Sequence, residues 1–136
     1  MRMRVLVACE FSGTVRDAFL ARGHDAISCD LLPTESPGPH IQGDVREVDL
    51  PSFDLMVAHP PCTHLAVSGA HAFAKKRAEQ RVALDLVRYL LEAPVPHIAL
   101  ENPVSIIGSE IRPADQVIQP WQFGHDASKA TCLWLK

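Results

Sequence analysis

The chain has 136 residues, of which 47% are hydrophobic and 21% are charged, and its formal net charge is −3. This length suits one domain with one core, and the composition is that of a soluble globular protein without a bilayer-spanning run. The acidic balance argues against general polyanion binding, although it leaves room for a local basic patch. The N-terminal apolar run Val5–Cys9 is too short for a signal peptide, so we expect a cytoplasmic protein.

Five short apolar runs predict strands. Three of them are nearly continuous in apolar character, which is typical of strands covered on both faces of a parallel sheet. The proline-rich segment Leu31–His40 predicts a loop. The five runs are Arg4–Cys9, Asp25–Cys29, Phe53–Ala58, His97–Leu100 and Thr131–Leu135.

Helical periodicity predicts two helices between these strands. The first is Thr14–Arg22, closed by Gly23. The second runs from about Ala72 to Glu92 and stops before Pro94. We expect Ala78, Val82, Leu86 and Tyr89 to form part of its apolar face, which Ala83, Leu90 and Leu91 broaden. The alternation of strands and helices predicts an α/β fold with a doubly wound, mostly parallel sheet, in a single domain over residues 1–136.

The stretch VACEFSGTVRDAF predicts a strand, a tight turn and a helix. Ligands of open α/β sheets bind at the carboxyl ends of strands, and Ser12-Gly13 would let the backbone approach a ligand there. An ordinary strand–helix turn is the alternative, because a single glycine is a weak signal.

Two acids follow later runs. Asp30 comes seventeen residues after Gly13, where an acid suits the hydroxyls of a ribose. Asp44, in Gly43-Asp44-Val45, could accept a hydrogen bond from an adenine amino group. Either acid alone is more often a loop residue or a helix cap, but the three signals in order predict an adenosine-containing cofactor. The lack of a GxGxxG pattern favours S-adenosylmethionine over NAD.

A cysteine follows two prolines where the third run ends, in DLMVAHPPCTH. Pro60 and Pro61 restrict the backbone and would present Cys62 rigidly at the edge of the sheet. A thiolate in such a place is a nucleophile, and C6 of a pyrimidine is a suitable target, since attack there makes C5 nucleophilic toward a methyl donor. Glu101, at the end of the fourth run, would activate the ring at N3.

These motifs resemble those of the DNA cytosine-C5 methyltransferases over roughly Val5–Val104. The resemblance implies a Rossmann-like methyltransferase fold, S-adenosylmethionine as cofactor, and a cytosine flipped out of DNA. It implies Cys62 as the nucleophile and Glu101 as the residue that holds the cytosine edge. It implies cofactor contacts at Phe11, Ser12, Gly13, Asp30, Asp44, Val45 and Pro60, and substrate contacts at Pro61, Asn102 and Lys129.

Three motifs depart from the family pattern. Pro61-Cys62-Thr63 replaces Pro-Cys-Gln, Glu101-Asn102-Pro103 replaces Glu-Asn-Val, and Lys129 stands in the place of an arginine. A separate target-recognition domain and a returning C-terminal helix have no counterpart, so we expect either a truncated chain or a minimal, C-terminally short relative of phage type. The substrate is then DNA or a smaller cytosine nucleotide, and a homodimer would suit so small a domain.

Other interpretations stay open. The chain could be a catalytically inactive nucleotide- or DNA-binding module, and Cys62 could be an inert loop cysteine. His59, Cys62, His64 and His71 could hold zinc. The stretch HPPC also resembles a distorted motif of the amino-methyltransferases. Cys9, Cys29 and Cys132 lie in or beside apolar runs, where we expect buried thiols rather than a disulfide framework.

Three further features have two possible explanations each. The second helix carries Lys75 and Lys76, and Arg77, Arg81 and Arg88 share one of its faces. A solvated face is the commoner case, and contact with a phosphate backbone is the alternative. The segment Val67–His71 could close over a base or merely connect elements. Trp121 and Phe123 could stack on bases, but we expect them to pack beneath a loop.

Overall fold

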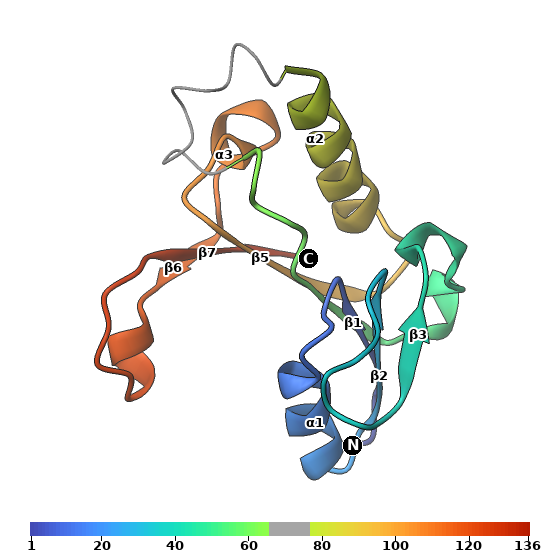
Figure 1. Ribbon diagram of the computed structural model, residues 1–136. Coiled ribbons are helices and arrows are strands. Elements are labelled where there is room, and N and C mark those ends of the chain that lie inside the picture. Colours follow the sequence, from blue (N-terminus) through green and yellow to red (C-terminus); the bar gives the residue numbers. More distant parts are fainter. Residues whose placement is uncertain (66–76) are drawn as a thin grey trace. The chain divides into compact units, whose positions relative to one another are not determined.

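The computed structural model describes residues 1–65 and 77–136 (Figure 1). Within these ranges the chain forms an α/β fold with a sheet of seven strands. The strands are β1 (Arg4–Ala8), β2 (Asp25–Asp30), β3 (His40–Gln42), β4 (Leu55–Ala58), β5 (His97–Pro103), β6 (Gln116–Ile118) and β7 (Thr131–Leu135). Their order in the sheet is β3-β2-β1-β4-β5-β7-β6.

The sheet is mostly parallel, as the sequence predicts. Strand β1 is parallel to both β2 and β4, and β2 is parallel to β3. Strands β6 and β7 form an antiparallel pair at the other end of the order. The helices are α1 (Thr14–Ala21), α2 (Arg77–Leu91) and the short α3 (Ile107–Glu110), with 3₁₀ turns η1 (Val45–Glu47), η2 (Leu50–Ser52) and η4 (Pro120–Phe123). No helix in the described ranges is long and apolar enough to cross a membrane.

The chain divides into two compact units. Unit 1 contains Met1–His59, Ala93–Ala99 and Lys136, and unit 2 contains Pro60–Glu92 and Leu100–Leu135. We describe each unit by itself. A single catalytic domain over the whole chain stays a prediction.

The core of unit 1 is built around β1. Its residues Val5–Ala8 are fully buried, because β2 and β4 flank the strand on its two edges. The register places Leu6 opposite Ile27 on one side and Met56 on the other. The strand β3 begins at His40, inside the segment expected to be a loop. Its three residues are too few to show a burial period in the sequence.

Helix α1 has the boundaries that the sequence predicts to within one residue. It ends in a Schellman motif, in which Gly23 N–H donates to the Leu20 carbonyl (3.0 Å) and His24 N–H donates to the Phe19 carbonyl (3.1 Å). Gly23 adopts φ +86°, a conformation that costs glycine little and other residues more.

The predicted apolar face of α2 in unit 2 is confirmed at Leu90 and wrong at Val82. The buried residues are Leu84, Val87 and Leu90, whereas Val82 is 67% exposed. Apolar residues occur on more than one side of this helix, so periodicity alone does not identify the buried stripe. The expected start of the helix, before Arg77, lies outside the described residues.

The elements β6 and α3 in unit 2 have no counterpart among the predicted elements. Strand β6 is largely exposed and is defined by its pairing with β7, where Val117 faces Cys132. Trp134 on β7 is 1% exposed, and its indole N–H donates to the Arg112 carbonyl at 2.8 Å. Tertiary contacts rather than local sequence signals therefore fix this part of the unit.

Candidate functional site

The turn between β1 and α1 borders an open cavity of about 300 Å³ at the carboxyl end of β1. Its volume lies at the lower end of the range for small-molecule sites. Two of the predicted cofactor residues, Phe11 and Ser12, line it, and Phe11 is 39% exposed. The full lining is Cys9, Glu10, Phe11, Ser12, Thr14, Val15 and His59.

Glu10 is a buried carboxylate that the sequence analysis did not single out. It is 7% exposed, and its oxygens accept hydrogen bonds from the amides of Val15 (2.9 Å) and Arg16 (3.2 Å) in the first turn of α1. The amide of Thr14 donates to Ser12 Oγ at 3.3 Å. The amides of Thr14, Val15 and Arg16 are thus satisfied by the protein, which leaves the Gly13 amide among the four N-terminal donors of this helix. An acid at a strand–helix turn complements the helix dipole, which is the signal that could have revealed Glu10.

Gly13 is required by packing inside the protein. It caps α1 with φ +81°, and a Cβ at this position would lie 2.6 Å from an Arg16 nitrogen and 2.9 Å from Ser36 Cβ. The predicted reason, close approach of a ligand, stays a prediction. The approach that the structure shows is that of the Arg16 side chain.

Arg16 is fully buried and joins α1 to the segment between β2 and β3. Its guanidinium donates to Asp17 (2.9 Å) on its own helix and to the Ser36 carbonyl (2.8 Å) in that segment. Further acceptors are Ser28 Oγ, Thr34 Oγ1 and the Pro39 carbonyl, at 3.1–3.3 Å. The hydrogen bond from Arg16, followed by that from Ser36, holds the pKa of Asp17 below its usual value. No local signal predicts this network, since its acceptors come from distant residues.

Asp30 and Asp44 both act as local caps. Asp30 Oδ1 accepts from the Leu32 amide, and Asp44 Oδ1 accepts from the Arg46 amide, each at 2.9 Å. This is the commoner role that the sequence analysis allowed for such acids. In the ranges that the structure describes, Oδ2 of each carboxylate has no hydrogen-bond partner, which leaves one oxygen per residue for a ligand. Val45, another predicted cofactor residue, is buried beside Asp44.

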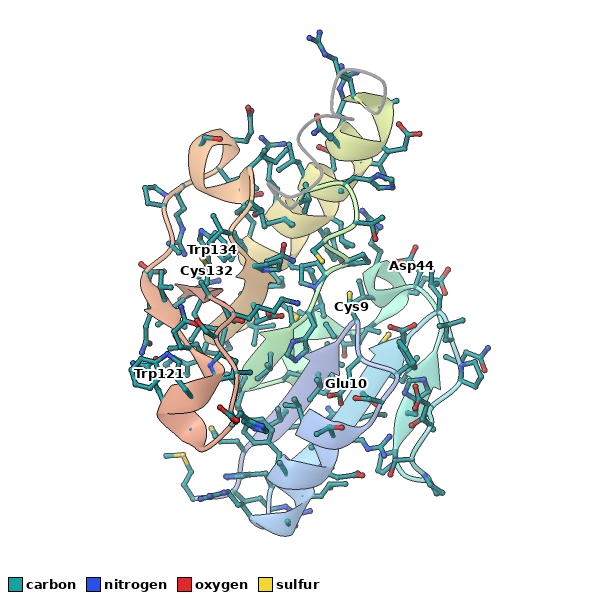
Figure 2. All side chains as sticks on the ribbon, turned by 60° about the vertical axis from the view of Figure 1, so that its left-hand side comes forward. Cys9, Glu10, Asp44, Trp121, Cys132 and Trp134 are labelled. Atoms are coloured by element: carbon teal, nitrogen blue, oxygen red, sulfur yellow. The ribbon has the colours of Figure 1, made fainter. Side chains whose placement is uncertain are left out.

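Cys9 lies near the carboxylates of Asp30 and Asp44. It is not the ordinary buried strand cysteine that we expected. It is half-buried, lines the cavity, and leaves β1 with φ +61°, a conformation that is sparsely populated by residues other than glycine. The pKa of its thiol is raised to about 12, chiefly by burial and then by the Asp30 carboxylate, the Cys29 thiol and the Asp44 carboxylate. Figure 2 shows Cys9 and Asp44 toward the same end of the unit 1 strands. Cys29 and Cys132 are buried, as expected.

In unit 2, Cys62 lies on a turn that is fixed at its far end. The Leu65 amide donates to the Cys62 carbonyl, and the Ile106 amide donates to the Leu65 carbonyl, both at 3.0 Å. Leu65 is fully buried and anchors the turn, whereas Cys62 is half-buried between the exposed residues Pro61 and Thr63. The thiol is therefore presented on a backbone that the fold holds in place.

The near end of the same turn is fixed by Asn102. Its Nδ2 donates to the Pro60 carbonyl at 2.9 Å, across 42 positions of the sequence. Asn102 is 1% exposed, so the structure gives it a positioning role, and its predicted contact with substrate stays a prediction. Pro60, also predicted to contact the cofactor, is buried beneath this bond. The two predicted catalytic motifs are thus joined directly by a buried hydrogen bond.

Glu101 precedes Asn102 on β5 and is partly exposed. Successive side chains of a strand alternate between faces, so Glu101 lies on the face opposite Leu100 and Asn102. Burial raises the pKa of the Cys132 thiol on β7, and the charge of Glu101 raises it further. Glu101 is therefore near β7. Its proximity to the Cys62 thiol stays a prediction.

The remaining predicted residues are not gathered at either site. Lys129 lies in the exposed loop before β7. The expectation that Trp121 and Phe123 pack beneath a loop is wrong, since they are 60% and 67% exposed on η4, where Figure 2 labels Trp121. Val67–His71, Lys75 and Lys76 lie outside the described residues. Among residues 1–65 and 77–136, no three His, Cys, Asp or Glu side chains are placed to hold a metal.

Comparison with known proteins adds no assignment. The sequence matches no model of a known protein family, and a search of curated proteins finds no match. The geometry of the two units therefore carries the functional argument.

Proposed function

We propose that this protein transfers a methyl group from S-adenosylmethionine to C5 of cytosine in DNA, with Cys62 as a transient covalent nucleophile. The observation that carries the proposal is the buried hydrogen bond from Asn102 to the Pro60 carbonyl. It fastens the Glu101-Asn102-Pro103 motif to the Pro60-Pro61-Cys62 turn. A structural role for either motif alone would not require the two to be joined.

The cofactor part of the proposal is supported by unit 1. The cavity beside Phe11 and Ser12 lies where ligands bind in open α/β sheets, and the α1 N-terminus is already occupied by the Glu10 carboxylate. This arrangement disfavours a pyrophosphate-containing cofactor and suits an adenosine without phosphates. The second oxygens of Asp30 and Asp44 would accept from its ribose and adenine. When bound, S-adenosylmethionine would supply an electrophilic methyl group.

The chemistry assigned to this chain is nucleophilic and acid catalysis. Cys62 Sγ would form a bond to C6 as Glu101 donates a proton or hydrogen bond at N3, which places the electron pair on C5. After C5 has taken the methyl group, the C5 proton leaves to water and the Cys62–C6 bond breaks. The thiolate and the aromatic ring are thereby restored, and Glu101 regains its proton.

The test is covalent trapping with DNA that contains 5-fluorocytosine, since fluorine at C5 blocks the final elimination. We expect the wild-type protein with cofactor to give an adduct stable on a denaturing gel. Cys62→Ser should give none, whereas Cys132→Ala, which removes a buried thiol of the same unit, should retain it. A wild-type protein that binds S-adenosylmethionine by calorimetry but forms no adduct would overturn the proposal and leave a binding module without catalysis.

A further inference from the structure

A groove in unit 2 runs along one face of α2 and has a volume of about 490 Å³. Its helical residues recur at intervals of three and four positions, so they occupy a single stripe of α2. The remaining wall comes from the segment around α3. The lining consists of Arg77, Gln80, Arg81, Leu84, Asp85, Arg88, Ile106 and Glu110.

The arginine at one end of the groove has polar partners, whereas the two arginines at the other end have none within the described ranges. Arg88 has partners, since its guanidinium lies 3.5 Å from the Asp85 carboxylate and donates to the Glu110 carbonyl at 3.4 Å. Arg77 and Arg81 are exposed, and neither has a hydrogen bond or ion pair within the described ranges. They are one helical turn apart, about 6 Å along the axis, where two like charges destabilise a helix slightly. An anion seated between them would reverse that effect.

Gln80 provides an independent sign of a missing acceptor. Its Nε2 is buried and has no hydrogen-bond partner in the part of the chain that the structure describes. A buried amide donor without an acceptor is unfavourable, and native proteins rarely keep one without a reason. Gln80 lies between Arg77 and Arg81 in sequence and lines the same groove. This end therefore offers two guanidiniums and one amide, all of them donors.

We propose that the α2 groove binds the phosphate backbone of a nucleic-acid strand, with Arg77, Gln80 and Arg81 as its contacts. The donors form a row along the helix rather than a closed cup, which fits successive phosphates better than a single anion. The carboxylates of Asp85 and Glu110 at the other end of the groove repel phosphate, so the contact is confined to the first turns of α2. The site does not depend on the proposed methyl transfer, because it needs neither Cys62 nor a cofactor.

The test measures binding of a fluorescein-labelled single-stranded 20-mer by fluorescence anisotropy, without cofactor, from 50 to 200 mM salt. We expect the double variant Arg77→Gln/Arg81→Gln to lower affinity about tenfold and to reduce the slope of log K against log salt by about 1.4, which is two single-strand contacts. The matched control is Arg2→Gln/Arg22→Gln, which removes two exposed charges from unit 1. It should change affinity less than twofold.

Gln80→Leu separates a built site from general electrostatic attraction. It keeps the net charge, so we expect affinity to fall about threefold to tenfold with an unchanged salt slope. Far-UV circular dichroism would verify that each variant is folded. An equal loss of affinity in the two arginine pairs would overturn the proposal, as would a wild-type protein that binds no oligonucleotide. Displacement of the 20-mer by inorganic phosphate at low millimolar concentration would show a single-anion site instead, and would also overturn it.

Discussion

Arg16 of unit 1 and the pair Arg77 and Arg81 of unit 2 lie in opposite environments. In unit 1 Arg16 is fully buried and surrounded by acceptors, and the buried Glu10 carboxylate caps α1. In unit 2 Arg77 and Arg81 are exposed and have no hydrogen bond or ion pair within the described ranges, although Asn102 of the same unit is buried and bonded. The fold of unit 1 therefore pairs the Arg16 guanidinium itself, whereas the described part of unit 2 does not pair those of Arg77 and Arg81.

We expect the largest loss of stability when the buried Arg16 guanidinium of unit 1 is removed. Arg16→Met leaves its carbonyl and hydroxyl acceptors unsatisfied, and we expect the free energy of unfolding to fall by about 3–5 kcal/mol. Urea unfolding followed by far-UV circular dichroism measures this. Arg22→Met, on an exposed position of the same segment, is the control and should stay within about 0.5 kcal/mol. Equal effects would show that the Arg16 network contributes little.

Gly13 and Gly23 allow the cost of a backbone conformation to be separated from the cost of side-chain crowding in unit 1. Gly13 and Gly23 have nearly the same φ, +81° and +86°, but a Cβ on Gly13 would meet Arg16, whereas none of the described atoms lies within 4 Å of a Cβ on Gly23. We expect Gly23→Ala to cost about 1 kcal/mol, which is the backbone term alone. Gly13→Ala should cost about 2–3 kcal/mol, because Arg16 must also move. Similar costs in urea unfolding would mean that Arg16 relaxes freely.

The hold on the Cys62 turn can be tested through Asn102. Asn102→Ala removes the donor to a buried carbonyl, and we expect it to cost about 1–2 kcal/mol and to slow 5-fluorocytosine trapping about tenfold. Ser109→Ala, at an exposed position of α3, should leave both unchanged. Loss of stability with an unchanged trapping rate would show that Asn102 supports the fold and does not position the thiol.

The last expected effect is a pH dependence to which the raised thiol pKa values of unit 1 contribute. Burial raises the pKa of Cys9 to about 12 and that of Cys29 to about 11, from an ordinary value of 9.0. Above pH 9 the unfolded chain loses these protons while the folded chain keeps them, so stability should fall as pH rises toward 11. Urea unfolding at pH 8 and pH 10 measures the decline. Cys9→Ala should make it shallower than in the wild type, and an equal decline in the variant would refute the assignment to Cys9.

Elements with a long, local sequence pattern were predicted, whereas very short elements were missed. The buried strands β1 and β4 and the helix α1 carry strong local patterns, and all three were predicted closely. The strands β3 and β6 have three residues each, so no period could show in them. The buried face of α2 was predicted at Leu90 but missed at Leu84 and Val87, because apolar residues occur on several sides of this helix. The exposure of Trp121 and Phe123 was likewise missed, since an aromatic residue by itself favours packing.

Local sequence signals were enough to predict five of the strands, the helices α1 and α2, the turn after β1, and a cysteine behind two prolines. These depend on residues close together in the chain, where glycine, proline and apolar periodicity act directly on the backbone. Only the tertiary structure decided that Glu10 occupies the amides of α1, that Arg16 gathers acceptors from the β2–β3 segment, and that Asn102 holds Pro60. Each of these joins groups separated along the chain, and burial makes an unsatisfied polar group costly enough to select one partner.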